Sequence, residues 1–179
     1  SLAPHLEKQG IAVIQLKVDK YGNLDLDEYD RYLNEDTALV TVMSANNETG
    51  VIFPVEKMAH MAKEKGVLFH TDAVQAAGKI PINMNNSAVD MLSISGHKLH
   101  APKGVGALYL RRGTRFRPFL RGGHQERNRR AGTENVTSII GFGKAAEIAQ
   151  AHIDEENTVV KKMRDRLEEE ILKRVPRTI

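Results

Sequence analysis

The sequence places polar side chains capable of catalysis directly after three short apolar runs. The apolar runs are residues 38–43, 67–69 and 89–94, and the polar segments that follow are SANNETG (44–50), HTDAVQ (70–75) and SGHK (95–98). Together these segments contain amide, carboxylate, hydroxyl, imidazole and amine groups. In open α/β sheets, ligands bind beyond the carboxyl ends of the strands. If the three runs are neighbouring parallel strands, their polar ends meet at one edge and form a binding site there.

Lys98 is the candidate with the most distinctive chemistry. It follows a buried apolar run and has Ser95 and His97 beside it. Desolvation and neighbouring positive charge at such a position favour the neutral amine, which is the form that makes a Schiff base. A carboxylate opposite it, from Asp72, would keep a pyridinium nitrogen protonated and let the ring act as an electron sink. An ordinary surface lysine is the alternative that the residues alone leave open.

Each of these polar residues also has a purely structural interpretation. Asp72 can cap a short helix that follows it, and the asparagines at 46–47 can supply turn conformations. Backbone groups can satisfy the imidazoles of His70 and His97. The spacing of His97 and His100 by itself would suit a metal ion. Because three successive strand ends carry such groups, we favour a functional site over separate structural roles, and we predict no metal in it.

The predicted elements alternate between strands and helices over the first 110 residues. A helix is predicted over 27–33, and another begins at Pro54 and stops at Gly66. The expected strands are 11–18, 38–43, 67–69, 89–94 and 105–110. This alternation predicts an α/β fold with a mostly parallel sheet flanked by helices.

The sequence beyond Asn135 predicts helices only. An Ala-rich apolar helix is expected over 135–151, and an amphipathic helix over 154–175. Ion pairs are expected between Glu169 and Lys173 and between Glu170 and Arg174, because residues four apart are neighbours on a helix surface. The apolar stripe of the second helix consists of Val160, Met163, Leu167 and Ile171. We therefore divide the chain into residues 1–134 and a helical part, residues 135–179.

Composition narrows the possible classes of protein. The chain has 179 residues, of which 41% are hydrophobic and 27% charged, and these values predict a globular fold. It contains no Cys, so these residues form no disulfide, thiolate metal site or cysteine nucleophile. No run of 18 apolar residues and no secretory signal are found, so we expect a soluble, cytoplasmic protein without a membrane partner.

Positive charge is concentrated in one segment. Residues 111–130 contain eight arginines and one acid, Glu126, for a local charge of +7 in a chain of net charge +3. Such a cluster can bind nucleic acid or another polyanion. A solvated, partly buried loop or a small-anion site is the interpretation that we favour, and we expect no nucleic-acid partner.

The polar segments and their surroundings resemble the NifS/IscS-type cysteine desulfurases, which belong to the class V aminotransferase group. The resemblance covers nearly the whole chain, and the segments that carry it are SANNETGVI (44–52), FHTDAVQAAGKIPI (69–82), SISGHKLHAPKGVGALYLRRG (93–113) and GGHQERNRRAGTENV (122–136). SGHK alone also occurs in relatives such as selenocysteine lyase. Its combination with GGHQE and RRAGTEN narrows the resemblance to the desulfurases, closest to the nitrogen-fixation type. The implied fold for residues 1–134 is part of the cofactor-binding large domain of type I pyridoxal phosphate enzymes.

The resemblance implies roles for residues around the cofactor ring. Lys98 matches the lysine that forms the internal aldimine and then moves protons during the reaction. Asp72 matches the partner of the pyridinium nitrogen, and Gln75 matches the residue that bonds the phenolic oxygen. Asn47 matches a residue near that oxygen and the substrate carboxylate.

The resemblance also implies a phosphate site and a dimer. Ser95 and His97 match ligands of the cofactor phosphate within one subunit. Thr133 matches a threonine that reaches the phosphate of the partner subunit's cofactor, so a homodimer is expected. This role would also explain the Arg-rich and Gly-rich loop before Thr133 without nucleic acid.

The implied reaction converts L-cysteine to L-alanine and transfers the sulfur atom to a cysteine of the enzyme, which becomes a persulfide. An iron–sulfur scaffold protein then receives this sulfur. The family's upstream phosphate loop and stacking histidine, and its downstream catalytic cysteine, have no counterpart in these residues. We therefore interpret the chain as a central part of such an enzyme, with residues 135–179 leading toward a mostly absent small domain. Selenocysteine lyase or another class V enzyme is one alternative, and a non-catalytic binding module is another.

Overall fold

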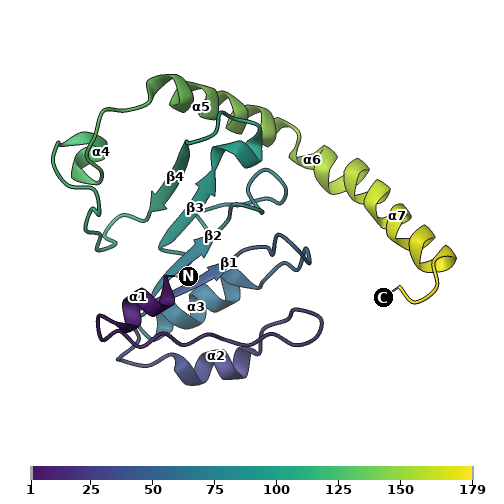
Figure 1. The fold of residues 1–179 in the computed structure, drawn as a ribbon, viewed down its shortest axis with the longest axis horizontal. Coiled ribbons are helices and arrows are strands. Elements are labelled where there is room, and N and C mark those ends of the chain that lie inside the picture. The colour runs from purple at the N-terminus through teal and green to yellow at the C-terminus, as the bar shows by residue number, and fades with distance from the viewer. Residues whose placement is uncertain (1, 179) are drawn as a thin grey trace.

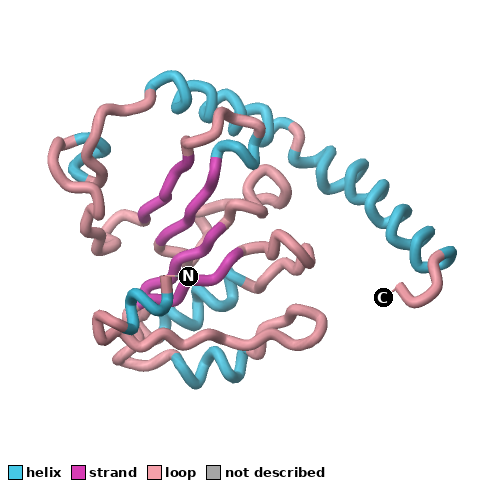
Figure 2. Tube along the Cα trace, viewed as in Figure 1, coloured by secondary structure: helices cyan, strands magenta, loops and turns pink. Residues whose placement is uncertain are grey.

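The computed structural model describes residues 2–178, which form a four-stranded sheet with helices around it (Figure 1). Strands and loops occupy the middle of the molecule, and a chain of helices leads away from it (Figure 2). In chain order the elements are α1 (Ala3–Glu7), α2 (Leu26–Tyr32), β1 (Leu39–Met43), α3 (Val55–Glu64), β2 (Leu68–Asp72), β3 (Met91–Ser95), the 3₁₀ helix η1 (Gly96–Leu99), β4 (Gly106–Leu110), α4 (Gln125–Asn128), α5 (Val136–Ala151), α6 (Ile153–Glu155), the π-helix η2 (Glu156–Val160) and α7 (Lys161–Arg174).

The sheet has the strand order β1-β2-β3-β4. β1, β2 and β3 are parallel, while β4 runs antiparallel to β3. The connections between the parallel strands pass through α3 and through the loop after β2. The prediction of an α/β fold with a mostly parallel, helix-flanked sheet is therefore confirmed.

α3 covers one face of the sheet and forms the core with it. Its buried residues Met58, Ala59 and Ala62 recur at helical spacing and pack in one cluster with Phe69 of β2. The hydroxyl of Tyr29, on α2, is buried and donates a hydrogen bond to the carbonyl oxygen of Met58, 2.9 Å away. α2 and α3 are thereby fixed to the same side of the sheet.

The limits of α3 follow the signals in the sequence. Pro54 precedes its first turn, where a missing backbone N–H costs no helical hydrogen bond. Gly66 adopts a left-handed conformation with φ of +73° directly after the helix, and its N–H bonds to the carbonyl oxygen of Lys63. The predicted start and stop of this helix are confirmed.

The predicted strand over residues 11–18 is wrong. This segment is irregular, and within residues 2–178 its only sheet-like pairing is an antiparallel bridge between Val18 and Leu24. Leu16 packs against the core cluster, but Ile11 and Ile14 are exposed. The β-rich composition could not form a strand because no neighbouring strand accepts its backbone hydrogen bonds.

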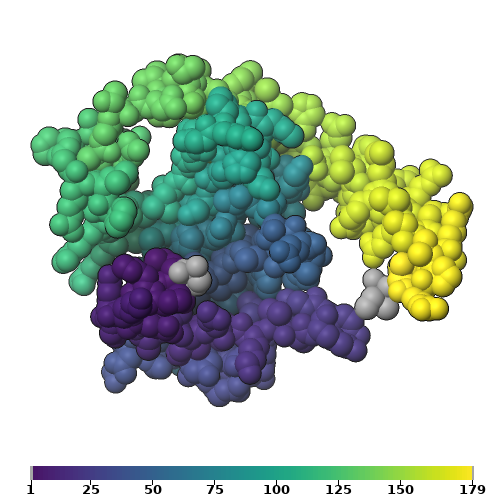
Figure 3. Space-filling model, in the orientation of Figure 1, coloured from purple at the N-terminus to yellow at the C-terminus, as the bar shows by residue number. Residues whose placement is uncertain are grey.

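The C-terminal helices form an arm that leaves the body of the protein. α5 contacts η1, and α6 and η2 lead from it to α7. Figure 3 shows α7 extending beyond the sheet and its covering helices. The predicted ion pairs of Lys173 with Glu169 and of Arg174 with Glu170 are present on α7.

The predicted helix over residues 154–175 begins at Ile153 and contains the π-helical turn η2, which periodicity did not indicate. Every residue of α7 except Glu170 is exposed. The apolar stripe that includes Met163 and Leu167 therefore has no cover from the residues that the structure describes.

Candidate active site

The carboxyl ends of β1, β2 and β3 lie at the same edge of the sheet. Met43 is in register with Asp72, and Asp72 is in register with Ser93. The backbone N–H of Ser44 donates to the carbonyl oxygen of Asp72 at 2.7 Å, and that of Ala73 donates to Ser93 at 2.9 Å. The three strands are parallel neighbours, as predicted, so their polar segments leave the sheet side by side.

Asp72 ends β2 with its side chain exposed at this edge. Its carboxylate oxygen Oδ1 accepts a hydrogen bond from the backbone N–H of Val74 at 2.9 Å. The residues after it form turns, so the interpretation of Asp72 as a helix cap gives way to an Asx-type turn. Oδ2 has no hydrogen-bond partner among residues 2–178, which leaves this oxygen available to a ligand.

Gln75 lies in the turn that follows Asp72. It is partly buried, and the alanines on either side of the turn, Ala73 and Ala76, are almost fully buried in the core. Burial of these small residues holds the backbone of the turn against the sheet. Asp72 and Gln75 therefore emerge from one anchored loop.

η1 carries His97 and Lys98 directly after β3. The Ser95 hydroxyl and the Nδ1 atom of His97 are 2.8 Å apart, so these two side chains are hydrogen-bonded to each other. Gly96 between them is buried, and a Cβ atom there would lie 2.9 Å from Val105 Cγ1. Only glycine fits at this position, which lets the chain turn sharply and direct Ser95, His97 and Lys98 toward the edge.

Lys98 itself is exposed, in contrast to the desolvated position that we expected for it. Its neighbour Leu99 is buried and anchors η1 to the body. The described residues therefore fix the backbone of Lys98 but leave its side chain in contact with water. Any desolvation has to come from a ligand or from a further part of the protein.

Asn47 and its neighbour Asn46 have different roles in the turn after β1. The side-chain oxygen of Asn46 accepts hydrogen bonds from the backbone N–H groups of Glu48 and Thr49, at 2.8 and 2.9 Å. Asn46 thus supplies the turn that the structural alternative assigned to this pair. Asn47 is exposed at the strand ends and makes no side-chain hydrogen bond within residues 2–178.

A row of side chains across the sheet was missed by the sequence analysis. The imidazole of His70 lies between two hydroxyl groups, with Nδ1 2.7 Å from Thr41 Oγ1 and Nε2 2.8 Å from Ser93 Oγ. Hydroxyl groups, not backbone groups, therefore satisfy His70. Since Asp72 is two residues further along β2, it shares this face of the sheet with His70. The period-two spacing of His70 and Asp72 was the available signal.

The environment of His70 predicts a pH-dependent stability. Burial lowers the pKa of His70 from its ordinary value of 6.5, and the nearby Asp72 carboxylate opposes this effect. The folded protein therefore binds fewer protons at this site than the unfolded chain does when the pH falls through 6.5. We expect the free energy of unfolding to decrease on acidification below about pH 6.5, and the loss to level off below the folded-state pKa.

Urea denaturation at a series of pH values between about 7 and 5 measures this slope. His70→Gln keeps an amide that donates and accepts hydrogen bonds but cannot titrate, so its slope should be smaller. The matched control is His60→Gln on the exposed side of α3, which should retain the wild-type slope. Equal slopes in wild type and His70→Gln would show that His70 does not contribute.

Thr133 lines a cavity of about 780 Å³ beside β4. The lining includes Gly106, Leu108, Phe116, Arg130 and Phe142 together with Thr133. Thr133 is exposed and has no hydrogen bond to the other candidate residues within 2–178. Gly106 pairs with Ser95, so this cavity adjoins the end of β3.

The arginine-rich segment contains both structural and exposed arginines. Arg111 is structural, because its guanidinium donates to the carbonyl oxygens of Val89, Met84 and Ser87. The other arginines of the segment, from Arg112 to Arg130, are exposed. Residues 126–128 all adopt left-handed conformations, with φ between 49° and 65°, although none is glycine.

Residues 2–178 contain neither a metal cluster nor a membrane-spanning helix. No group of three or more His, Cys, Asp or Glu side chains in residues 2–178 is placed to hold a metal ion. None of the helices described for this chain combines the length and the apolar character needed to cross a bilayer.

The functional groups at this edge fit pyridoxal phosphate. Its aldehyde requires an amine, which Lys98 could supply, and its ring nitrogen requires a carboxylate with an available oxygen, which Asp72 could supply. The hydroxyl and imidazole of Ser95 and His97 are hydrogen-bond donors for an anion. The Gly96 turn and the Asp72 turn bring these groups to the same edge.

Comparison with known proteins agrees with the fold. The family model of the class V aminotransferases matches residues 2–178, so the chain belongs to the class V aminotransferase family. It is 62% identical over 176 residues to a cysteine desulfurase of Gluconacetobacter diazotrophicus and 61% identical to the cysteine desulfurase NifS of Azotobacter vinelandii. Each match covers 98% of this chain and 44% of the relative. The chain thus spans less than half the length of these curated relatives.

Solved structures share the same architecture. A NifS-like protein superimposes with a TM-score of 0.90 at 42% sequence identity, covering 95% of this chain and 47% of that protein. A structure described as SspA in complex with cysteine has a TM-score of 0.77 at 37% identity, covering 80% of this chain and 42% of that one. The predicted resemblance to NifS-like cysteine desulfurases is confirmed at the level of family and fold.

Proposed function

We propose that this chain is part of a pyridoxal phosphate-dependent cysteine desulfurase. The observation that carries the proposal is the single sheet edge that holds Asp72, Gln75, Ser95, His97 and Lys98 in a chain 61–62% identical to cysteine desulfurases. The substrate is L-cysteine and the products are L-alanine and sulfur carried as a protein persulfide. This chain has no Cys, so the sulfur-accepting thiolate belongs to another part of the enzyme.

Each candidate residue has a defined task toward the cofactor. Lys98 would attach the cofactor and move protons, and Asp72 would hold its ring nitrogen in the protonated form. Gln75 and Asn47 would bind near the phenolic oxygen, while Ser95 and His97 would bind the phosphate. When bound, pyridoxal phosphate supplies the electron sink that weakens bonds at the substrate α-carbon.

Thr133 supports a proposal about assembly. Thr133 is exposed and makes no hydrogen bond to the other candidate residues within residues 2–178, which leaves it available to a neighbouring subunit's phosphate, so we propose that the enzyme is a homodimer with shared sites. We further propose that it works in the cytoplasm and passes sulfur to an iron–sulfur scaffold protein, in support of nitrogen fixation. These assignments rest on the likeness to NifS-type relatives.

Sulfide release tests the proposed reaction. The full-length enzyme that contains this chain should produce sulfide in the presence of a reductant, together with one L-alanine for each L-cysteine consumed. The chain of 179 residues by itself should release no more sulfide than free pyridoxal phosphate does, because it has no thiol.

Parallel assays with L-selenocysteine separate the proposal from its main rival. Turnover of L-selenocysteine with none of L-cysteine would identify a selenocysteine lyase. Turnover of neither substrate by a full-length protein that binds the cofactor would contradict both activities and favour a binding module.

A further inference from the structure

The turn that carries Asp72 and Gln75 continues into the attachment point of the helical arm. Lys79 follows Gln75 in the same run of turns, and its carbonyl oxygen accepts a hydrogen bond from Asn157 Nδ2 at 2.8 Å. Asn157 lies 78 residues further along the chain, in η2. One backbone segment therefore carries two proposed cofactor ligands and also holds the arm.

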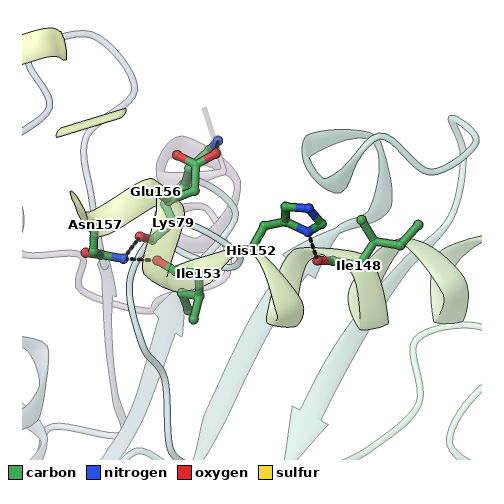
Figure 4. A network of polar contacts seen from close by, with 6 residues as sticks. All are labelled: Lys79, Ile148, His152, Ile153, Glu156 and Asn157. Carbon is green, nitrogen blue, oxygen red and sulfur yellow. Dashed lines mark hydrogen bonds and ion pairs between the residues drawn. The ribbon is translucent and has the colours of Figure 1, made fainter. Parts of the chain in front are cut away.

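The NH2 group of the Asn157 side chain makes two hydrogen bonds. Its nitrogen also donates to the carbonyl oxygen of Ile153 at 2.7 Å, so the two N–H bonds of one amide join the arm to itself and to the body (Figure 4). The Lys79 ammonium group is in addition 3.0 Å from the Glu156 carboxylate. Lys79 is exposed and Glu156 partly buried, so water screens this ion pair and its contribution is small, whereas the amide contact holds the backbone of the turn directly.

The local geometry of the arm makes this contact possible. His152 ends α5 with φ of −103° and ψ of 6°, outside the helical region, and its Nδ1 atom lies 2.9 Å from the carbonyl oxygen of Ile148. η2 then adds a π-helical turn that contains Asn157. π-helical turns cost stability and are frequent at functional positions. Here the turn places the Asn157 side chain over the Lys79 carbonyl.

Gly78 adds a second link between the same parts. It has φ of +73°, and a Cβ atom there would lie 2.5 Å from Leu99 Cδ2 and 3.1 Å from Ala149 Cβ. Leu99 adjoins Lys98 in η1, and Ala149 belongs to the last turn of α5. The turn after Asp72, the helix η1 and the end of α5 therefore meet at Gly78, a position that only glycine can occupy.

We infer that Asn157 is a positioning residue: through the Lys79 carbonyl it fixes residues 73–79, the turn that follows Asp72 and carries Gln75, to the helical arm. Because α7 follows η2 directly, a displacement of α7 would be transmitted through Asn157 to this turn. The roles of Asp72 and Gln75 in this inference rest on the proposed function. The tether between Lys79 and Asn157 does not, so it can be tested without cofactor.

Asn157→Asp in the full-length enzyme is the sharpest test. The substitution keeps the shape but replaces the donating amide with a carboxylate that faces two carbonyl oxygens. Backbone amides of residues 73–80 should exchange with deuterium roughly two- to tenfold faster in the cofactor-free protein, as expected for loss of one hydrogen bond. Amides of β2 and α3 should keep their wild-type rates, which separates a local effect from general destabilisation.

The bound cofactor provides the second measurement. In Asn157→Asp the visible absorption band of bound pyridoxal phosphate should shift, and its dissociation constant should rise, because Asp72 and Gln75 contact the ring. Asn157→Gln retains a donating amide and should recover part of the wild-type spectrum. Lys79→Met keeps the accepting carbonyl and should behave nearly as wild type, as should Lys173→Met on the exposed side of α7.

The outcomes separate this inference from the proposed function. Wild-type exchange rates at residues 73–80 in a folded Asn157→Asp protein would overturn the tether. Faster exchange with an unchanged absorption band would overturn the positioning role. If the wild-type enzyme bound no pyridoxal phosphate, the proposed function would fail, and the exchange measurement would still decide whether the tether exists.

Discussion

Lys98→Ala is expected to abolish covalent attachment of pyridoxal phosphate to the full-length enzyme and to lower kcat by about 10³-fold or more. The physical reason is that one amine both attaches the cofactor and moves protons, and η1 presents that amine at the carboxyl edge of the sheet. Borohydride reduction makes the attachment permanent, so peptide mass spectrometry of the reduced enzyme identifies the modified lysine. Some non-covalent binding should persist through Asp72, Ser95 and His97.

Lys103 provides the matched control for Lys98. It is an exposed lysine five residues further on, in the loop between η1 and β4, and it lies outside the set of proposed ligands. Lys103→Ala should retain both the attachment and the activity. Reduction that labels Lys103 in the wild-type enzyme would refute the assignment of Lys98.

Asp72→Asn is expected to lower kcat by about 10²-fold while leaving the fold intact, since a preorganised charge of this kind contributes about that much. The amide retains the oxygen that accepts from Val74, so the turn should survive. It loses the charge that favours the protonated ring nitrogen. The loss should appear in kcat more than in the apparent KM for L-cysteine, because the charge acts on the chemical step.

Asp90→Asn tests whether any carboxylate of this sheet has the same effect. Asp90 precedes β3 at the opposite end of the strands, where its Oδ2 atom accepts from the backbone N–H of Phe69 at 2.9 Å. Its substitution should reduce stability and leave kcat per folded molecule nearly unchanged. A full kcat in Asp72→Asn would show that Asp72 serves only the turn that follows β2.

Local signals in the sequence determined the position of most regular elements. Pro54 and Gly66 delimit α3, and the Asp25 side chain caps α2 by accepting from the backbone N–H groups of Asp27 and Glu28. These signals act over three or four residues, so they operate in the same way in any fold. The strands at 38–43, 67–69, 89–94 and 105–110 were also found, within a few residues of their observed limits.

The candidate site was predictable to the same degree. The polar segments follow buried runs, and a mostly parallel sheet must bring its carboxyl strand ends to one edge. The sequence therefore sufficed to predict the candidate residues at that edge, including Asp72, Ser95 and Lys98. Their roles toward a cofactor come from the family resemblance and remain proposals.

The tertiary structure alone decided the features that depend on distant partners. A strand over residues 11–18 requires a neighbour, and the sheet offers none there. The row from Thr41 through His70 to Ser93 joins three strands, with 29 and 23 residues between successive members, and no local pattern specifies the register of these strands.

The same holds for the arm. Residues 153–157 have the composition of an ordinary helix. The structure shows that the π-helical turn brings Asn157 into contact with Lys79, 78 residues away in the sequence. From the sequence, Gly78 is an ordinary turn glycine, and only the structure shows that Leu99 and Ala149 pack against it. Periodicity and helix caps depend on residues that are close in the chain, so the sequence determined the helices and strands. Strand pairing and close packing depend on which segments meet in space, so only the tertiary structure determined the contacts between these elements.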